Sequence, residues 1–182
     1  EMVRAEYRWV TLIENALNVG FARANNQGAT IATAPLLLLL NSDAAVMPAA
    51  LPATVDFMHD HPEVGIVGLQ LLNDDLTLQP SGGKFPTLVS TMVGLLPVPI
   101  AWRQAYGRRR SARDYTRPAC VDEVSGAAMA VRRNLFAALG GFDESFYFFG
   151  EDVDLCWRVR KSGCLIAYLP AAQAIHSWGS AR

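Results

Sequence analysis

Runs of apolar residues between turn residues indicate the strands of this chain. Five consecutive leucines occupy positions 36–40, after Pro35 and before the polar Asn41-Ser42-Asp43. A short apolar run that stops at turn residues predicts a strand covered on both faces, although a buried helical turn is the alternative because leucine is a weak strand former. Similar runs predict further strands over residues 65–72, 120–131 (with a turn at Ser125-Gly126) and 165–169, after which residues 172–176 lead outward.

Helical signals alternate with these strands. An alanine-rich segment, residues 21–34, stops before Pro35. Residues 151–162 carry three acids in the first turn, Lys161 near the end and Gly163 as a stop, which is the polarity that the helix dipole favours. Two shorter helices are predicted over residues 47–60 and 134–139, the second closed by Gly140-Gly141. The alternation predicts an α/β layered sheet with helices on both faces.

Residues 77–117 follow neither pattern, and we expect them to leave the sheet. Their apolar stretch, residues 88–102, is interrupted by Pro97 and Pro99 and is shorter than the roughly 20 residues that a spanning helix needs. One interpretation is an apolar patch that rests on an anionic membrane surface beside clustered arginines; the alternative is a buried loop with a solvated basic turn. The arginines are Arg103, Arg108, Arg109, Arg110 and Arg113.

The composition indicates one globular domain over residues 1–182. Of its 182 residues, 51% are hydrophobic and 18% charged, with a formal net charge of −1, which argues against a disordered chain or a nucleic-acid partner. Cys120, Cys156 and Cys164 form no CxxC pair, so we expect three reduced thiols. These features predict a cytoplasmic protein, and the membrane interpretation would place it at the inner face of the membrane.

Two polar segments of the sequence could hold a nucleotide or a metal. Asp43 comes after a buried strand, where open α/β sheets bind ligands, and a carboxylate there suits Mg²⁺ or Mn²⁺ shared with substrate phosphates. Residues 18–26 place Gly20 and Arg23 at a helix start that could accept phosphate. Taken alone, either segment is more often an ordinary turn or helix cap than a binding site.

A stretch rich in aromatics and acids, residues 146–158, leads into the last predicted helix. It delivers Glu151 and Asp152 to the helix start, where the dipole keeps a carboxylate ionised, as a general base requires. Helix capping would explain one acid, whereas stacking on sugar rings would explain the aromatics. His176 follows the last strand, and such a lone histidine is often only structural.

Taken in order, these segments resemble family-two glycosyltransferases of the GT-A fold, especially the rhamnosyltransferase and galactofuranosyltransferase branch. The matching stretches are NVGFARANNQG (18–28), LLLLLNSD (36–43), HPEVGIVG (61–68), VSGAAMAVRR (124–133), GGFDESF (140–146), GEDVDLCWRVRKSG (150–163) and AIHSWGS (174–180). The resemblance implies an inverting transfer of a sugar from a dTDP- or UDP-linked donor to a saccharide or lipid-linked acceptor, in cell-wall or surface polysaccharide synthesis.

The resemblance also implies a role for each matched residue. Asp152 matches the catalytic base, and Asp43 with His176 matches the Mg²⁺ or Mn²⁺ ligands. Residues matched to the donor nucleotide and sugar are Asn18, Gly20, Asn25, Asn41, Gly126 and Ala127. Phe149 and Glu151 fall on the acceptor side.

One departure from the family pattern concerns the start of the chain. Members begin with a βαβ unit that reads the nucleotide base, and no matching segment precedes Asn18 here. We therefore expect a partial domain whose N-terminal strands are largely missing. Two alternatives remain open: a non-catalytic nucleotide- or carbohydrate-binding remnant of this fold, and a metal-dependent phosphohydrolase that uses Asp43 and His176.

Overall fold

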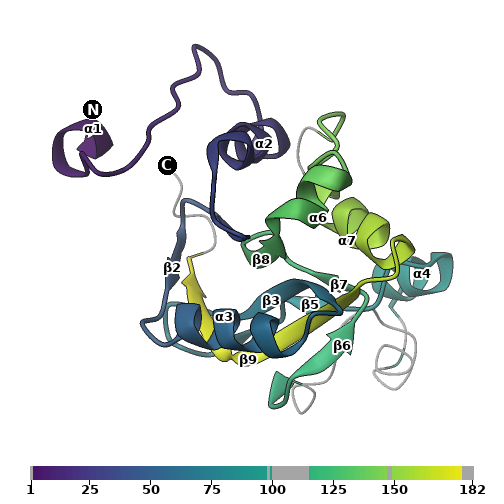
Figure 1. Ribbon diagram of the computed structural model, residues 1–182. Helices are drawn as coiled ribbons and strands as arrows, with labels where there is room; N and C mark the ends of the chain where they lie inside the picture. The colour runs from purple at the N-terminus through teal and green to yellow at the C-terminus, as the bar shows by residue number, and fades with distance from the viewer. Residues whose placement is uncertain (1, 98, 100–114, 147–148, 178–182) are drawn as a thin grey trace.

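A mixed sheet forms the centre of the molecule. Figure 1 shows the computed structural model of the chain, which describes residues 2–97, 99, 115–146 and 149–177. Five strands run in the order β1-β8-β3-β9-β2. In this order they span Leu36–Leu40, Ala128–Arg132, Val64–Leu72, Leu165–His176 and Ala44–Val46. Strands β3 and β9 run parallel, while β1 and β8, β8 and β3, and β9 and β2 pair antiparallel.

Two short strands extend the sheet. Strand β4 (Leu78–Gln79) pairs with β3, and β6 (Ala119–Val121) pairs with β9. A separate two-stranded sheet joins β5 (Gly82–Gly83) to β7 (Glu123–Val124). Gly68 on β3 lets Val124 of β7 pack closely over the main sheet, because a Cβ at position 68 would lie 2.4 Å from Val124 Cγ1.

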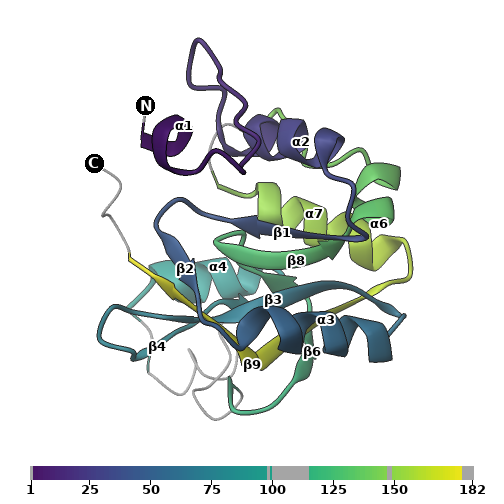
Figure 2. The same cartoon turned by 60° about the vertical axis from the view of Figure 1, so that its left-hand side comes forward.

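Helices cover both faces of the sheet, which confirms the predicted layering (Figure 2). Helix α3 (Ala50–Asp60) packs on β3 and β9 from one side. On the other side lie α2 (Phe21–Ile31), α6 (Arg133–Ala138) and α7 (Glu151–Lys161). Before α2, the described residues form one further helix, α1 (Met2–Glu6), which buries no side chain. No helix in the described part of the chain is long and apolar enough to cross a membrane.

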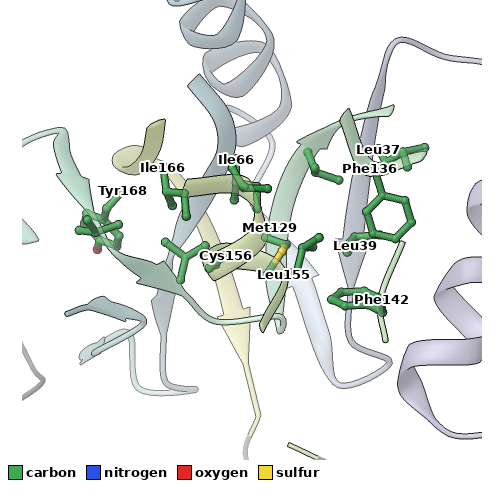
Figure 3. Packing of buried hydrophobic residues seen from close by; sticks show 14 of the residues in the cluster. Leu37, Leu39, Ile66, Met129, Phe136, Phe142, Leu155, Cys156, Ile166 and Tyr168 are labelled. Carbon is green, nitrogen blue, oxygen red and sulfur yellow. The ribbon is translucent and has the colours of Figure 1, made fainter. Parts of the chain in front are cut away.

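Each face of the sheet has its own apolar core. Ile66, Met129 and Leu155 are fully buried in the core that α7 covers (Figure 3). Val67 and Met58 belong to the core under α3. Because neighbouring strand residues point to opposite faces, Ile66 and Val67 anchor β3 in both cores. Burying one such side chain contributes roughly 1.5–3 kcal/mol.

The leucine strand departs from the prediction of cover on both faces. Leu37 and Leu39 are buried, whereas Leu36 and Leu38 are only half-buried and Leu40 is exposed. The physical reason is the position of β1 at one end of the strand order. The prediction holds for β3, in which eight of nine residues are buried.

The last strand is longer than predicted. Strand β9 continues through Pro170 to His176 instead of ending at Leu169. Its register against β3 shifts after the Leu69–Leu169 pair, and pairing resumes between Gln70 and Gln173. Proline is tolerated at such an irregularity, because no ladder hydrogen bond from its nitrogen is required there.

Other element boundaries differ by a few residues. Helix α2 ends at Ile31, and α3 begins at Ala50, after a turn that contains Pro48. Part of the segment expected to leave the sheet is regular, because it contains β4, β5 and the helix α4 (Leu88–Leu95). The predicted arginine cluster lies outside the described residues.

Candidate active site

Asp152 is held at the start of α7 by two backbone groups. Gly150 precedes the helix in the left-handed region, with φ 98°. Asp152 Oδ2 accepts a hydrogen bond from the N–H of Gly126 at 3.0 Å, and Oδ1 accepts one from the N–H of Val153 at 2.8 Å. Hydrogen bonds from these two N–H groups fix the direction of the carboxylate. The backbone therefore sets the orientation of this side chain.

The third acid of this helix turn has a different partner. Asp154 forms an ion pair with Arg158 at 2.6 Å, one helical turn later. Arg158 also donates to the backbone oxygens of Leu139 and Gly141, at 3.0 and 2.8 Å. This pair ties α7 to the segment that follows α6.

A cavity of about 840 Å³ opens beside Asp152. Its walls come from residues 80–83, 85 and 86, from residues 115 and 123–125, and from residues 146, 149, 150, 152–154 and 157. Trp157 packs edge-on against Phe85, with ring centroids 5.3 Å apart. Phe149 also lines the cavity, is 68% exposed and has a positive φ of 65°, a strained conformation for a non-glycine residue. An aromatic wall next to a carboxylate suits a sugar whose hydroxyl must lose a proton.

Glu151 does not face the cavity beside Asp152. It is 8% exposed and is not among the residues that line this cavity. Burial raises its pKa above that of an ordinary glutamate. Its position in the core layer under α7 explains the shift, because desolvation disfavours the charged form.

The structure brings Asp43 and His176 together. Residue Ala44 pairs with His176 across β2 and β9, and the N–H of Ser177 donates to the backbone oxygen of Asp43 at 3.0 Å. As a result, His176 Nε2 lies 3.3 Å from Asp43 Oδ1. Both side chains are mostly buried, with 9% and 17% of their surfaces exposed. Neither lines the cavity beside Asp152.

The backbone links this pair to the Asp152 region. The N–H of Asn41 donates to the backbone oxygen of Ala127 at 3.0 Å. Ala127 follows Gly126, whose N–H is bound by Asp152. Residues 41–43 therefore run from the Gly126 loop to the end of β9.

The paired side chains fit a divalent cation of the predicted kind. Asp43 supplies a carboxylate oxygen and His176 an imidazole nitrogen, and the remaining positions of an octahedral ion would be left to water and phosphate oxygens. Across the described residues, no group of three or more His, Cys, Asp or Glu side chains could hold a metal ion by itself. A substrate phosphate would therefore have to complete the site.

Two asparagines that were predicted to bind the donor form hydrogen bonds within their own segments. Asn18 Oδ1 accepts from the N–H of Gly20 at 2.9 Å, and Asn25 Nδ2 donates to the backbone oxygen of Phe21 at 2.9 Å. The start of α2 nevertheless lies beside the Asp152 loop, since a Cβ on Gly126 would be 3.6 Å from the ring of Phe21.

Several residues at the site were not predicted from the sequence. Gln79 Oε1 lies 2.7 Å from His176 Nδ1, and Phe85, Tyr115 and Trp157 line the cavity. Trp157 belongs to the aromatic and acidic stretch, so its position in that stretch was the one available signal. Nothing in the local sequence marks Gln79.

Comparison with solved structures identifies the fold as GT-A. It aligns with the crystal structure of GalNAc-T7 with UDP, GalNAc and Mn²⁺ at a TM-score of 0.68 and 16% identity, covering 98% of this chain and 35% of that one. It aligns with the mannosyltransferase PcManGT from Pyrobaculum calidifontis, in complex with GDP-Man and Mn²⁺, at a TM-score of 0.61 and 20% identity, covering 98% and 44%. At these identities the likeness concerns the fold alone.

The family follows from the sequence match. Residues 1–180 match the family described as Glycosyltransferase like family 2, and the chain belongs to that family. It is 31% identical over 144 residues to the N-acetylglucosaminyl-diphospho-decaprenol L-rhamnosyltransferase of Mycobacterium tuberculosis (strain CDC 1551 / Oshkosh), covering 77% of this chain and 46% of that protein. It is 34% identical over 97 residues to the rhamnosyltransferase WbbL of Escherichia coli (strain K12), covering 51% and 33%. The chain thus spans less than half the length of these two relatives.

Proposed function

We propose that this chain carries the catalytic centre of an inverting glycosyltransferase, which moves a sugar from a nucleoside-diphosphate donor to an acceptor hydroxyl. The observation that carries the proposal is the position of Asp152, held by Gly126 at the wall of an aromatic-lined cavity. We extend the proposal to a dTDP- or UDP-linked donor and a product in cell-wall or surface polysaccharide. Relatives named as rhamnosyltransferases support sugar transfer as the reaction.

In this reaction Asp152 acts as the general base. The acceptor oxygen attacks the anomeric carbon of the donor sugar while Asp152 takes the hydroxyl proton. The bond from that carbon to the diphosphate breaks, the electron pair leaves with the diphosphate, and attack from the opposite side inverts the anomeric centre. A positioned base of this kind contributes about 10²–10⁴-fold to the rate.

Asp43 and His176 hold a Mg²⁺ or Mn²⁺ ion in this proposal. When bound, such an ion supplies Lewis-acid neutralisation of charge on the diphosphate. The donor is contacted from the start of α2 and from the Gly126 loop. The donor-binding residues would be Asn18, Gly20, Asn25, Asn41, Gly126 and Ala127.

The acceptor would enter the cavity beside Asp152, where Phe149 and Trp157 offer apolar ring faces. The name of the mycobacterial relative specifies a lipid-linked saccharide, so a saccharide or lipid-linked acceptor is the first class to examine. Glu151 would act on the acceptor side only through its neighbour Asp152, since it is buried and does not line the cavity.

A thermal-shift panel with UDP, dTDP and GDP, each with and without Mn²⁺, tests the donor half of the proposal. A ligand present at 100 times its Kd raises the stability by about 2.7 kcal/mol. We expect a shift with UDP or dTDP that requires Mn²⁺ and is lost in Asp43→Ala. A chain that no nucleotide stabilises, with or without metal, would not be a transferase of this kind.

The same samples distinguish a transferase from the competing activity, a phosphohydrolase. A metal-dependent phosphohydrolase would release phosphate from a nucleotide without any acceptor. Our proposal predicts no acceptor-independent phosphate release above that of Asp152→Asn.

We also propose that α4 contacts a membrane surface, which would bring a lipid-linked acceptor to the cavity. The helix exposes one apolar stripe, while its inward side buries Ser90 and Val93. The exposed side chains are Leu88, Val89, Met92 and Leu95. The helix follows directly after Phe85 and Pro86, which line the cavity.

Flotation with anionic vesicles tests the contact. The unmodified chain should float with the vesicles, and the double variant Leu88→Glu/Met92→Glu should not. Recovery of both proteins, or of neither, contradicts membrane contact through α4.

A further inference from the structure

Polar side chains between β3 and β4 form a chain of hydrogen bonds that ends at His176. The chain begins at Asp75, whose carboxylate oxygen Oδ1 accepts from the Thr77 hydroxyl at 2.5 Å and from the Thr77 N–H at 3.0 Å. These bonds lower the pKa of Asp75, the hydroxyl contributing most, so the carboxylate is an acceptor only.

The direction of the first bond decides the orientation of Asn73. A hydroxyl has one hydrogen, and Thr77 gives it to Asp75. Thr77 Oγ1 must then accept from Asn73 Nδ2, which lies 2.9 Å away. The amide oxygen of Asn73 consequently points to the other side, toward Gln79.

The orientation of Gln79 follows in the same way. Its Nε2 donates to Asn73 Oδ1 at 3.0 Å and to the backbone oxygen of His176 at 3.3 Å. Its Oε1 is therefore the atom that lies 2.7 Å from His176 Nδ1. Because an amide oxygen only accepts, Nδ1 must carry the hydrogen.

The other ring nitrogen then faces Asp43. With Nδ1 bonded to Gln79, Nε2 is the ring nitrogen that faces Asp43 Oδ1, 3.3 Å away. At this separation either a proton on Nε2 or a metal cation can bridge the two side chains. The side chains are mostly buried, so water screens a charge held between them poorly.

We propose that Gln79 is a positioning residue, which holds His176 in the Nδ1–H tautomer and so presents Nε2, together with Asp43, to a divalent cation. The part that concerns the cation rests on the function proposed above. The part that concerns the tautomer rests only on the hydrogen bonds from Asp75 to Gln79. Removing such a partner of a ligating histidine typically weakens metal binding 10- to 100-fold.

The tautomer is tested without metal, by long-range ¹H–¹⁵N correlation NMR of the imidazole nitrogens. The chain has three histidines, so His59→Gln with His61→Gln leaves His176 as the one signal. In this background we expect the hydrogen on Nδ1. Gln79→Leu should move it to Nε2, where it can be donated to Asp43, whereas Gln79→Glu keeps an acceptor and should retain Nδ1–H. A hydrogen on Nε2 and none on Nδ1 in the protein that retains Gln79 would overturn the proposal.

Metal binding is tested by titrating Mn²⁺ alone and observing free Mn²⁺ by electron paramagnetic resonance. We expect Gln79→Leu to bind 10- to 100-fold more weakly and Gln79→Glu to restore binding to within a few fold. Gln70→Leu is the matched control, because Gln70 bonds Tyr168 and not His176. Circular dichroism melting verifies that each variant folds.

The outcomes separate this inference from the proposed function. Unchanged Mn²⁺ affinity in Gln79→Leu, with the tautomer altered, would overturn the positioning role. If the unmodified chain shows Nδ1–H but binds no Mn²⁺, the metal site fails as part of the proposed function, while the role of Gln79 in holding the tautomer stands.

Discussion

The carboxylate of Asp152 accepts a hydrogen bond from the backbone N–H of Gly126, with 3.0 Å between Oδ2 and the nitrogen. This bond joins the start of α7 to the loop between β7 and β8. The close approach requires a small residue at position 126, since a Cβ there would lie 3.3 Å from Asp152 Cβ. The proposed base is thus oriented by a backbone group.

Replacing Asp152 by Asn tests its role as the base. The amide oxygen can still accept from Gly126, so we expect the loop and nucleotide affinity to be largely kept. Transfer should fall by about 10²–10⁴-fold, because the amide cannot take the acceptor proton. Initial rates and nucleotide titration measure the two effects separately. Asp56→Asn, on the exposed side of α3, is the control and should transfer sugar at the normal rate. Normal turnover in Asp152→Asn would exclude Asp152 as the base.

Gly126→Ala tests whether the position of Asp152 matters. The added methyl must displace either Asp152 or the Phe21 ring by a few tenths of an ångström. We expect kcat to fall by about tenfold, since displacements of about 1 Å can cost 10²-fold. Gly28→Ala is the matched control, because nothing lies within 4 Å of its Cβ and alanine in a helix interior adds about 0.5–1 kcal/mol of stability. Equal kcat in the two variants would contradict the prediction.

Glu151 should make stability depend on pH. Its pKa is raised by burial, so the native state holds the proton more tightly than the unfolded chain does. Stability therefore falls as pH rises from the ordinary glutamate pKa of about 4.3 through the native value. Glu151→Gln should unfold at higher urea concentration than the unmodified chain at pH 7 to 8, and the difference should vanish near pH 4.

Glu63→Gln is the control for this experiment. A backbone hydrogen bond and the neighbouring His61 lower the pKa of Glu63, so its removal should give no gain in stability at neutral pH. No gain in Glu151→Gln would show that burial of Glu151 does not cost stability. An equal gain in Glu63→Gln would show that the effect is not specific to the buried carboxylate.

The cysteines should differ strongly in reactivity. Cys156 is fully buried on the inner face of α7, and burial raises its pKa to about 12, whereas Cys120 is exposed. Because the thiolate is the nucleophile, iodoacetamide at pH 8 should label Cys120 first and Cys156 only when the chain unfolds. Mass spectrometry after timed labelling, with and without urea, measures this difference. Labelling of Cys156 at the rate of Cys120 would indicate that α7 opens readily.

Local sequence determined the elements that carry the proposed chemistry. The acids and bases at opposite ends of α7 and the glycine at position 163, with φ 88°, define that helix through interactions within one or two turns. The apolar run of β3 and the turn at Gly140-Gly141 are equally local. Such signals depend on neighbours in the chain, so they can be interpreted without knowledge of the fold.

Only the tertiary structure decided how these elements meet. Asp43 contacts His176 because β2 pairs with β9, and β9 reaches that point because a register shift accommodates Pro170. Gln79 meets His176 through pairing between β4 and β3. These contacts depend on register between distant strands, where a shift of one residue turns every side chain to the other face, and no short stretch of sequence encodes that choice.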